Sequence, residues 1–443
     1  MREGKTPVRM TISRKDFIGS PYTDCPKCGK HTFGVFIGAG HGNSFGKECT
    51  ECGHTAGFKL PEIKKRIVYL DQFVLDNIVK ALDPKHPKHE IVLKDPFWLE
   101  LYKKLEVATR SQLIVCPDSF FHREESGPTG YFEAMQRIYE HFSGGSTFND
   151  HDQITRQQIC EHFDNYLKGH PEIEPTTEPE KIVHGELHEW HGRMHISVNA
   201  KPRDEEVTET NKAKAETYKR FLEVFERWKT DTHKKFDDWY REENRGFATG
   251  TMQVIRKHFE RRAQLPERVA RGEELSLNDL FPPASLGLIE AMQVTARRAG
   301  MTDLSEIMRK IGEYLFSENL DHIPVLRIGS LLYAALADQA AHGRTKPPSQ
   351  GVVVDVNMIS SLMPYCEAIF VDKENAALLA DNRVKNRLGC NTRIFSLRNK
   401  EEFLQYLDEV IASASTEHTD HLNNYYGPSW QEPYMTILHE KLK

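Results

Sequence analysis

The chain has no apolar run long enough to cross a membrane. A membrane-spanning helix needs about 20 apolar residues, and no segment approaches that length. The N-terminus, MREGKTPVRMTISRKDF, also lacks the apolar core of a secretory signal peptide. We therefore expect a cytoplasmic protein that makes no contact with a membrane.

The chain also lacks an excess of positive charge and any internal repeat at a fixed period. Its formal net charge of −6 argues against a globally basic nucleic-acid binder, although local basic surfaces remain compatible with this value. With 443 residues, 39% of them apolar, the chain can bury a substantial core in two or three domains.

The cysteines do not follow the pattern of a disulfide framework. Of the 8 cysteines, four form two close pairs near the N-terminus, and Cys116, Cys160, Cys366 and Cys390 are scattered. This pattern predicts one metal site and several free thiols in a reducing compartment. Cys116 and Cys366 adjoin predicted strands, so we expect both thiols to lie in the core.

Residues 1–62 contain the most specific motif of the sequence. Two C-x2-C pairs are separated by twenty residues, and each is followed by a glycine: Cys25, Cys28 and Gly29, then Cys49, Cys52 and Gly53. Four thiolates complete a tetrahedral Zn²⁺ site, which makes the predicted zinc structural. With a strand at 32–37 and a glycine-rich tip at 38–42, the unit resembles a zinc ribbon, and a module this small needs its metal to fold.

Residues 63–145 alternate between strand and helix patterns. Apolar runs at 66–70 and 112–116 are each followed by acids, and helical patterns cover 73–82, 97–108 and 131–142. The first run leads to Asp71, and the second leads to Asp118, Glu124 and Glu125. Alternation of this kind predicts a parallel sheet with covering helices.

Residues 146–320 are polar, charged and mostly helical in periodicity. The segment 205–243 contains no proline or glycine, which predicts one or two long amphipathic helices, and further helices are expected at 249–263, 286–298 and 303–315. Aromatic residues recur at near-helical spacing at Phe221, Phe225, Trp228, Phe236 and Trp239. We interpret this stripe as core packing rather than base stacking. The long helices are also compatible with a homodimer or a protein partner.

Four histidines in the same region raise the possibility of a second metal site. His184, His188, His191 and His195 would form one stripe if the segment were helical. The zinc-protease pattern H-E-x-x-H is absent, and Gly185 weakens a helix here. A polar surface or a pH-sensitive contact is the favoured interpretation.

Residues 321–412 return to the α/β pattern. An apolar helix rich in small residues is predicted at 325–337, with a last strand at 392–395 and a last helix at 400–411. Between them, the runs 352–354 and 368–371 predict two buried parallel strands ending in Asp355 and Asp372. Ligands bind at the carboxyl ends of such strands, where two carboxylates suit a divalent cation. Taken singly, each aspartate is better explained as a turn residue or a helix N-cap, so the prediction depends on the pair. The tail, 413–443, has apolar residues from Trp430 onward that we expect to dock.

The order of these motifs resembles that of PIN-domain nucleases, especially bacterial PIN-like proteins. The features that carry the resemblance are the acids after the strands, the apolar R-I-x-S-L-L-Y-A helix and the P-Y-C segment before the strand that ends in Asp372. The resemblance covers 63–145 and 321–412 as two halves. It implies an α/β fold with a PIN-like parallel sheet and covering helices, split by a large helical insertion at 146–320, with the zinc ribbon as an N-terminal appendage.

The resemblance implies a metal-dependent endonuclease that hydrolyses phosphodiester bonds, with RNA as the expected substrate and stress response or phage defence as the expected role. Asp71, Glu125, Asp355 and Asp372 would hold Mg²⁺ or Mn²⁺ and carry the catalysis. Glu125 is preferred to Glu124 because it lies six residues after Ser119, a spacing common in the family. Asp118 is expected to be a helix N-cap.

Two other classes of function remain open. A catalytically inactive PIN-like adaptor could bind nucleic acid or protein through the ribbon and the insertion, although it would not need all four acids. A phosphatase with an aspartyl nucleophile usually shows D-x-D. Here Asp71 is followed by Gln-Phe and Asp355 by Val-Asn, so this alternative is weaker.

Overall fold

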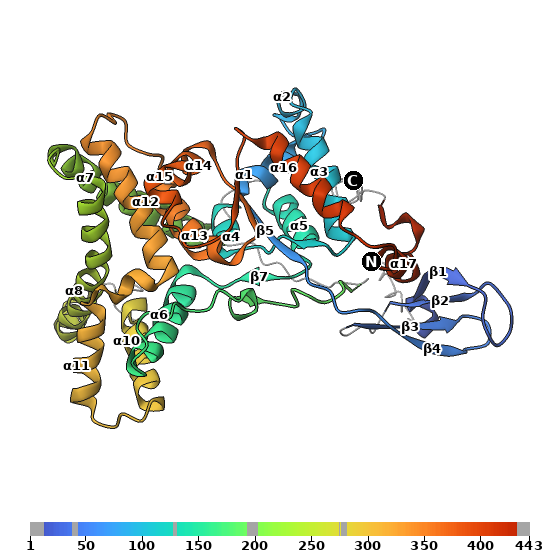
Figure 1. The fold of residues 1–443 in the computed structure, drawn as a ribbon, viewed down its shortest axis with the longest axis horizontal. Helices are drawn as coiled ribbons and strands as arrows, with labels where there is room; N and C mark the ends of the chain where they lie inside the picture. The colour runs from blue at the N-terminus through green and yellow to red at the C-terminus, as the bar shows by residue number, and fades with distance from the viewer. Residues whose placement is uncertain are drawn as a thin grey trace, which may run out of the picture.

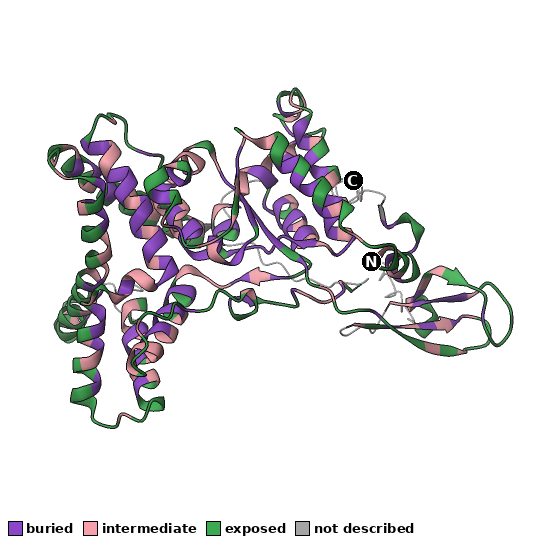
Figure 2. Ribbon diagram, in the orientation of Figure 1, coloured by how far each residue is buried: buried purple, intermediate pink, exposed green. Residues whose placement is uncertain are grey.

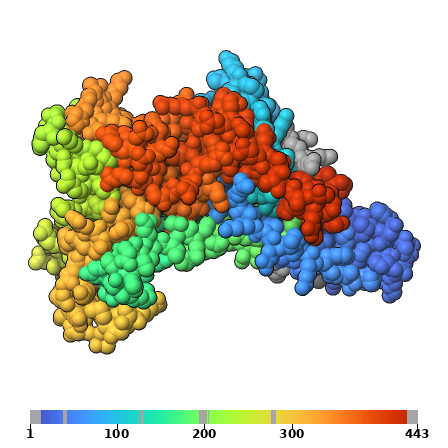
Figure 3. All heavy atoms as spheres, viewed as in Figure 1, coloured from blue at the N-terminus to red at the C-terminus, as the bar shows by residue number. Residues whose placement is uncertain are grey.

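The computed structural model describes residues 13–37, 43–126, 131–192, 203–273, 275 and 281–431. The molecule is elongated, with a small β unit at one end, an α/β region in the middle and a group of long helices at the other end (Figure 1). In the space-filling view, the C-terminal third of the chain forms a continuous surface over the middle region (Figure 3). The glycine-rich tip predicted at 38–42 lies outside the described residues.

The N-terminal unit is a four-stranded antiparallel sheet in the order β1-β2-β3-β4. Its elements are η1 (Arg14–Phe17), β1 (Ile18–Thr23), β2 (Phe33–Phe36), β3 (Ser44–Cys49) and β4 (Thr55–Lys59). The strand predicted at 32–37 is therefore confirmed as β2. Only a few side chains are buried inside this sheet, among them Phe33, Cys25 and Cys49, so the unit has little apolar core of its own.

A parallel sheet lies at the centre of the molecule, and the fold is mixed α/β as the alternating pattern predicts. Its strands are β5 (Arg66–Leu70), β6 (Ile114–Val115), β9 (Ala368–Phe370) and β10 (Arg393–Phe395), in the order β10-β9-β5-β6. Ile67 and Tyr69 pack on one face of β5, and Val68 and Leu70 pack on the other. Burial on both faces explains why β5 is continuously apolar.

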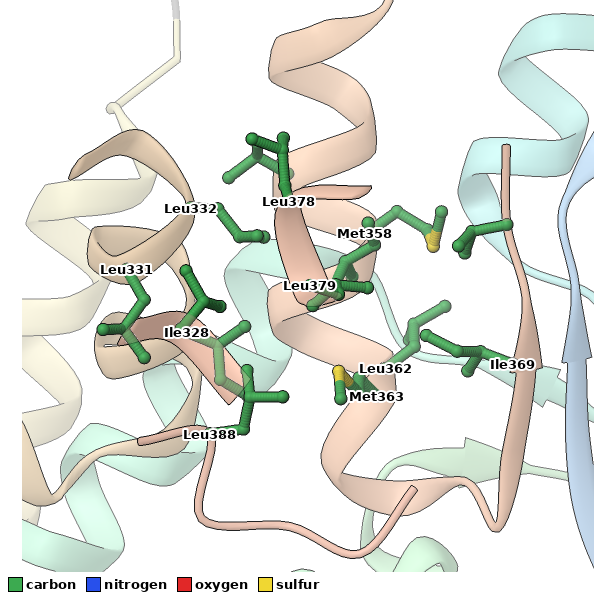
Figure 4. Close-up of a cluster of buried hydrophobic side chains, with 14 of the residues drawn as sticks. Ile328, Leu331, Leu332, Met358, Leu362, Met363, Ile369, Leu378, Leu379 and Leu388 are labelled. Carbon is green, nitrogen blue, oxygen red and sulfur yellow. The ribbon is translucent and has the colours of Figure 1, made fainter. Parts of the chain in front are cut away.

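Helices cover both faces of this sheet. One face carries α1 (Gln72–Leu82), α2 (His89–Val92), α3 (Phe97–Arg110), α5 (Phe132–Ser143) and α16 (Lys400–Ala412). The other face carries α12 (Pro324–Ala341), α13 (Val352–Leu362) and α14 (Lys373–Ala380), whose apolar side chains meet those of β9 (Figure 4). The helices predicted at 73–82, 97–108, 131–142, 325–337 and 400–411 are confirmed.

One predicted strand is wrong. Residues 352–354 form the first turn of α13 and not a parallel strand. Val352, Val356 and Ile359 recur at helical spacing and are all buried. A short apolar run cannot be assigned to strand or helix from periodicity alone. Here the burial of this face against α12 outweighs the β preference of three consecutive valines.

The long helices at the far end are α6 (His151–Leu167), α7 (Asp204–Thr230), α8 (Phe236–Ala270), α10 (Ala284–Arg298) and α11 (Leu304–Leu315). α7 and α8 share a core with the α/β region, whereas α10 and α11 pack with parts of α6 and α8 and the start of α12 in a separate apolar cluster. The aromatic stripe is buried in the same cluster as residues of α12, α13 and β9. The interpretation of the stripe as core is therefore confirmed. Both buried and exposed stretches are visible along the ribbon of the long helices (Figure 2).

The remaining elements connect these layers. They are α4 (Phe120–Ser126), β7 (Thr147–Phe148), η2 (Pro179–Lys181), β8 (Val183–His184), η3 (Glu318–His322), η4 (Met363–Tyr365), α15 (Asn382–Lys385), α17 (Thr416–Tyr426) and η5 (Pro428–Gln431). β7 and β8 form a two-stranded antiparallel sheet. Cys116 and Cys366 lie in the core, as predicted. Among the described helices, none has the length and apolar content needed to span a bilayer.

The N-terminal sheet packs against the end of the chain. Phe45 of β3 lies 4.9 Å from Tyr425 of α17, measured between ring centroids. Trp190 belongs to the same apolar cluster and donates a hydrogen bond from Nε1 to the carbonyl of Pro61 at 2.8 Å. Trp430 is also buried in this cluster. The predicted docking of the tail is thus confirmed at Trp430, and residues 432–443 lie outside the described part of the chain.

The buried stripe generates a stability prediction. Phe225 is fully buried, so we expect Phe225→Ala to lower the free energy of unfolding by about 3–5 kcal/mol. Glu223 lies two residues away on the exposed side of α7, and Glu223→Ala should change the free energy of unfolding by less than about 0.5 kcal/mol. Urea denaturation of both variants measures the two values. Equal, small effects would show that the stripe is not core.

Candidate metal centres

The four N-terminal cysteines converge on one point. Their ligand atoms all lie within 4.8 Å of one another. The sulfurs of Cys25 and Cys52 are 3.6 Å apart, and those of Cys28 and Cys49 are 3.7 Å apart. A tetrahedral ion with Zn–S bonds of about 2.3 Å requires sulfurs about 3.8 Å apart, whereas a disulfide requires about 2.05 Å. The site therefore has the geometry of a four-cysteine centre for a metal ion such as zinc.

The backbone explains why each pair is followed by glycine. Gly29 has φ +71° and Gly53 has φ +68°, a left-handed conformation that glycine adopts without strain. The turns end with hydrogen bonds from Gly29 N–H to the Cys25 carbonyl and from Gly53 N–H to the Cys49 carbonyl. Each turn thereby holds its pair of thiols on the same side.

Two of the predicted acids lie side by side at the carboxyl end of the central sheet. Asp71 follows β5, and Asp372 follows β9 after one residue. The strands are paired in register, and the Asp71 N–H donates to the Phe370 carbonyl at 3.0 Å. From β5 the chain first forms β6 on one side and later β9 and β10 on the other. Asp71 and Asp372 therefore flank the point where the strand order reverses, which is where open α/β sheets bind ligands.

The other two acids reach this point from helices. Glu125 of α4 and Asp355 of α13 line a narrow pocket together with Asp71. Its volume of about 10 Å³ is close to the space that one water molecule needs. The prediction that Asp355 ends a strand is wrong, but the first turn of α13 still brings its side chain to the carboxyl end of the sheet.

Asn375 connects two of the acids, and the sequence analysis did not identify it. Asp372 is the N-cap of α14, where its Oδ1 accepts from the Asn375 N–H at 2.8 Å. The Asn375 side-chain amide donates to Asp372 Oδ2 at 2.9 Å and also bonds to Asp355. Asn375 is almost fully buried. Its position three residues after an N-cap aspartate is the only sequence signal that could have indicated this role.

Burial and mutual repulsion act together on these carboxyls. The pKa of Asp71 is raised well above its ordinary value, first by burial and then by the charges of Asp355, Glu125 and Asp372. Burial and the charge of Asp372 raise the pKa of Asp355 to about 7, while the hydrogen bond from Asn375 opposes this rise. Negative charges are held together here at a cost in free energy, and a bound cation would reduce that cost.

The acids form an open cluster rather than a closed cage. Within the described ranges, the cysteines are the only group of three or more histidine, cysteine or acidic side chains whose ligand atoms all lie within 4.8 Å of one another. An ion at the acid cluster would therefore have some protein ligands and several waters. Mg²⁺ binds in this way, because it loses its water ligands reluctantly.

Aromatic and neutral polar groups form the base of the pocket. His122 stacks on Tyr69 with 5.0 Å between ring centroids, and its Nε2 donates to the Leu70 carbonyl at 2.8 Å. Burial lowers the pKa of His122 to about 4, so the ring is neutral at physiological pH. It positions its neighbours and cannot serve as a general acid there.

Two smaller predictions about α4 have different outcomes. Asp118 is not the N-cap, because Ser119 Oγ accepts the His122 N–H at 3.3 Å. Asp118 instead pairs with Arg123, at 2.8 Å from Nη2. Glu125 lines the pocket, but the side chain of Glu124 lies outside what the structure describes, so the choice of Glu125 as a ligand stays a prediction.

The described histidines of the 184–195 segment do not lie on a helix, so the helical stripe considered as a second metal site is absent from the described residues. His184 lies in β8, and His188 Nδ1 accepts from the Lys65 N–H at 3.3 Å while its Nε2 lies 3.1 Å from Glu180. The His191 ring lies against Gly144, and His195 lies outside the described residues. No histidine that the structure describes belongs to a cluster of metal-ligand side chains.

No protein-family model matches this chain, and neither a curated protein nor a solved structure matches it.

The cysteine centre generates a prediction about zinc. The purified chain should carry one zinc per molecule, and Cys49→Ser should reduce this to below about one tenth, as measured by mass spectrometry of the metal. Loss of the ion should unfold the β unit, because its core is small. Trp190 and Trp430, which pack against that unit, should then change their fluorescence. Cys390 lies outside the centre, so Cys390→Ser should retain full zinc and the wild-type spectrum.

The acid cluster generates a prediction about pH. The raised pKa of Asp355 means that the folded state binds this proton more tightly than the unfolded state. The resulting stabilisation is complete below about pH 4 and is lost as the pH rises to about 7. In buffer without Mg²⁺ or Mn²⁺, Asp355→Asn should therefore increase the free energy of unfolding at pH 8 by on the order of 1 kcal/mol.

This increase should disappear near pH 4, where the wild-type carboxyl is itself protonated. Urea denaturation at the two pH values provides the comparison. A variant that is less stable than the wild type at pH 8 would contradict the repulsion between these carboxyls.

Proposed function

We propose that this chain is a metal-dependent endonuclease that hydrolyses phosphodiester bonds, with single-stranded RNA as its substrate. One observation carries the proposal: four acids from separate segments of the chain converge at the point where the strand order of the parallel sheet reverses. Residues 71 and 372 come from strand ends, and residues 125 and 355 come from helices. A purely structural role would not require four partly buried acids to be brought to one place.

The donor set fits Mg²⁺ or Mn²⁺. All four ligands are carboxylates, and hard cations prefer oxygen. The pKa values of Asp71 and Asp355 are raised because ionising these groups without a partner is unfavourable. A bound cation would stabilise their ionised forms. When bound, the ion would lower the pKa of a coordinated water and neutralise charge on the scissile phosphate.

The chain's own residues would orient this chemistry. Asn375 fixes the carboxylates of Asp372 and Asp355 relative to each other, which reduces the rearrangement needed when substrate binds. The side chains of Tyr69, Phe121 and Met358 line the pocket beside the acids and limit the access of water. Because His122 is neutral, it adds no positive charge to the acid cluster.

The resemblance of the motif order to PIN-domain nucleases supports the choice of nuclease over other metal-dependent hydrolases, and it is the reason for proposing RNA. The four-cysteine unit, proposed as a structural zinc ribbon, would provide a further surface for nucleic acid or protein.

The test is cleavage of end-labelled single-stranded RNA and DNA with Mn²⁺, with Mg²⁺ and without either ion. Chelators are omitted so that the cysteine centre keeps its metal. We expect metal-dependent cleavage of RNA and a loss of more than about 100-fold in rate for Asp71→Asn, because losing a ligand should cost more than losing a residue that orients one.

Asp372→Asn should reduce the cleavage rate to the same extent, because it also removes a carboxylate ligand. It should preserve the fold, because asparagine still caps α14. Asp381 provides a matched control, because it is the N-cap of α15 and lies outside the acid cluster, so Asp381→Asn should cleave at the wild-type rate. Wild-type activity in Asp71→Asn would refute the assigned site. Binding of RNA without cleavage under any condition would favour an adaptor.

A further inference from the structure

A second, cationic pocket lies at the same end of the sheet as the acids. Its volume is about 350 Å³, and Arg344, Lys373, Glu374 and Arg398 provide its charged groups. Lys373 directly follows Asp372, and Arg398 lies three residues beyond the end of β10. Because β9 and β10 are neighbours in the parallel sheet, both cations are delivered by adjacent strand ends.

The charges in this pocket are not balanced. Arg344 is held by Gln339 at 3.0 Å, by the Lys346 carbonyl at 2.9 Å and by an ion pair with Glu374. This pair neutralises the only acid that lines the pocket. Within the part of the chain that the structure describes, the Lys373 ammonium and the Arg398 guanidinium form no ion pair. Two positive charges are therefore available to a ligand.

The sheet fixes the order of the two sites. The Val371 N–H donates to the Phe395 carbonyl at 2.9 Å, and the Asp71 N–H donates to the Phe370 carbonyl at 3.0 Å. Neighbouring strands are about 4.8 Å apart. Arg398 after β10, Asp372 and Lys373 after β9, and Asp71 after β5 therefore lie at three successive strand ends along the carboxyl end of the sheet. A chain of phosphates laid along this line would meet both groups in turn.

The lining of the pocket indicates which part of a nucleotide it contacts. The uncharged lining is Gln339, Ala377 and Leu378, with no aromatic side chain on which a base could stack. Lysine and arginine are the side chains that bind backbone phosphates irrespective of sequence. The pocket thus suits a phosphate with its sugar.

We propose that this pocket holds a backbone phosphate of a single-stranded RNA, next to the phosphodiester that the acid cluster cleaves. Lys373 and Arg398 contact the phosphate, and Arg344 keeps Glu374 neutralised. The inference rests on the proposed function for the identity of the substrate. It adds a positioning site: the phosphate in this pocket sets which neighbouring bond reaches the acids.

The test measures binding separately from cleavage. All proteins carry Asp71→Asn in the full chain, and a fluorescently labelled single-stranded RNA is titrated at several salt concentrations. Adding Lys373→Gln and Arg398→Gln should weaken binding at least about 10-fold and reduce the slope of log affinity against log salt by about 0.7, the value for one phosphate contact on a single strand.

The matched control removes the same charge elsewhere. Lys257 of α8 and Lys385 of α15 are exposed and do not line the pocket, so Lys257→Gln with Lys385→Gln should leave both affinity and slope within error. Equal losses of RNA affinity in the two double variants would show that net charge alone causes the effect, and this would overturn the proposal. An unchanged salt slope in the pocket variant would overturn it as well.

Two further arms separate the possible failures. Titration of the parent and the pocket variant with inorganic phosphate tests the source of the ligand. If the pocket variant binds inorganic phosphate more weakly than the parent but binds RNA equally well, the assignment of the pocket to a backbone phosphate is overturned. In chains with Asp71 intact, Lys373→Gln with Arg398→Gln should raise KM for RNA more than it lowers kcat. If no chain cleaves RNA but the salt slope falls as expected, the nuclease proposal fails and the phosphate site stands.

Discussion

Repulsion among partly buried carboxylates at the carboxyl end of the sheet is the constraint that the packing of the central region has to overcome. Asp71, Asp355 and Asp372 are held together by a sheet and two helices that are themselves firmly packed. The sheet places Asp71 beside Asp372 through backbone hydrogen bonds, and the first turn of α13 adds Asp355. A cation bound among these acids would relieve the repulsion between their charges.

The rest of the molecule supports that arrangement. Most side chains of helix α12 are buried. One side of the helix packs on α13 and α14, and the opposite side packs on α7 and α8. α7 and α8 therefore contribute to the same core as the α/β region, while α10 and α11 pack in a separate apolar cluster that reaches the start of α12. At the opposite end, the β unit is fixed by α17 and Trp190, which couples the cysteine centre to the C-terminal segment of the chain.

Much of this could be predicted from the sequence, because local chemistry determined it. The cysteine spacing and the glycines of the turns are one example, and Asp71 after a short apolar strand is another. Residues 352–354 were assigned to the wrong element because three valines favour a strand locally, while burial against α12 favours a helix. Asn375 was missed because its role depends on Asp355, which is twenty residues away and on another helix. The histidine spacing was compatible with a helix, but Gly185, with φ +96°, belongs to a turn.

The central claim is that the acid cluster binds a divalent cation, and the most direct measurement is titration of Mn²⁺ into the zinc-loaded chain near pH 7, followed by electron paramagnetic resonance of free Mn²⁺. The account predicts saturable binding to the wild type, with release of protons as the raised pKa values of Asp71 and Asp355 fall. It also predicts loss of this binding when both residues are replaced by asparagine. Equal binding by the two proteins, or no binding by the wild type, would contradict the account.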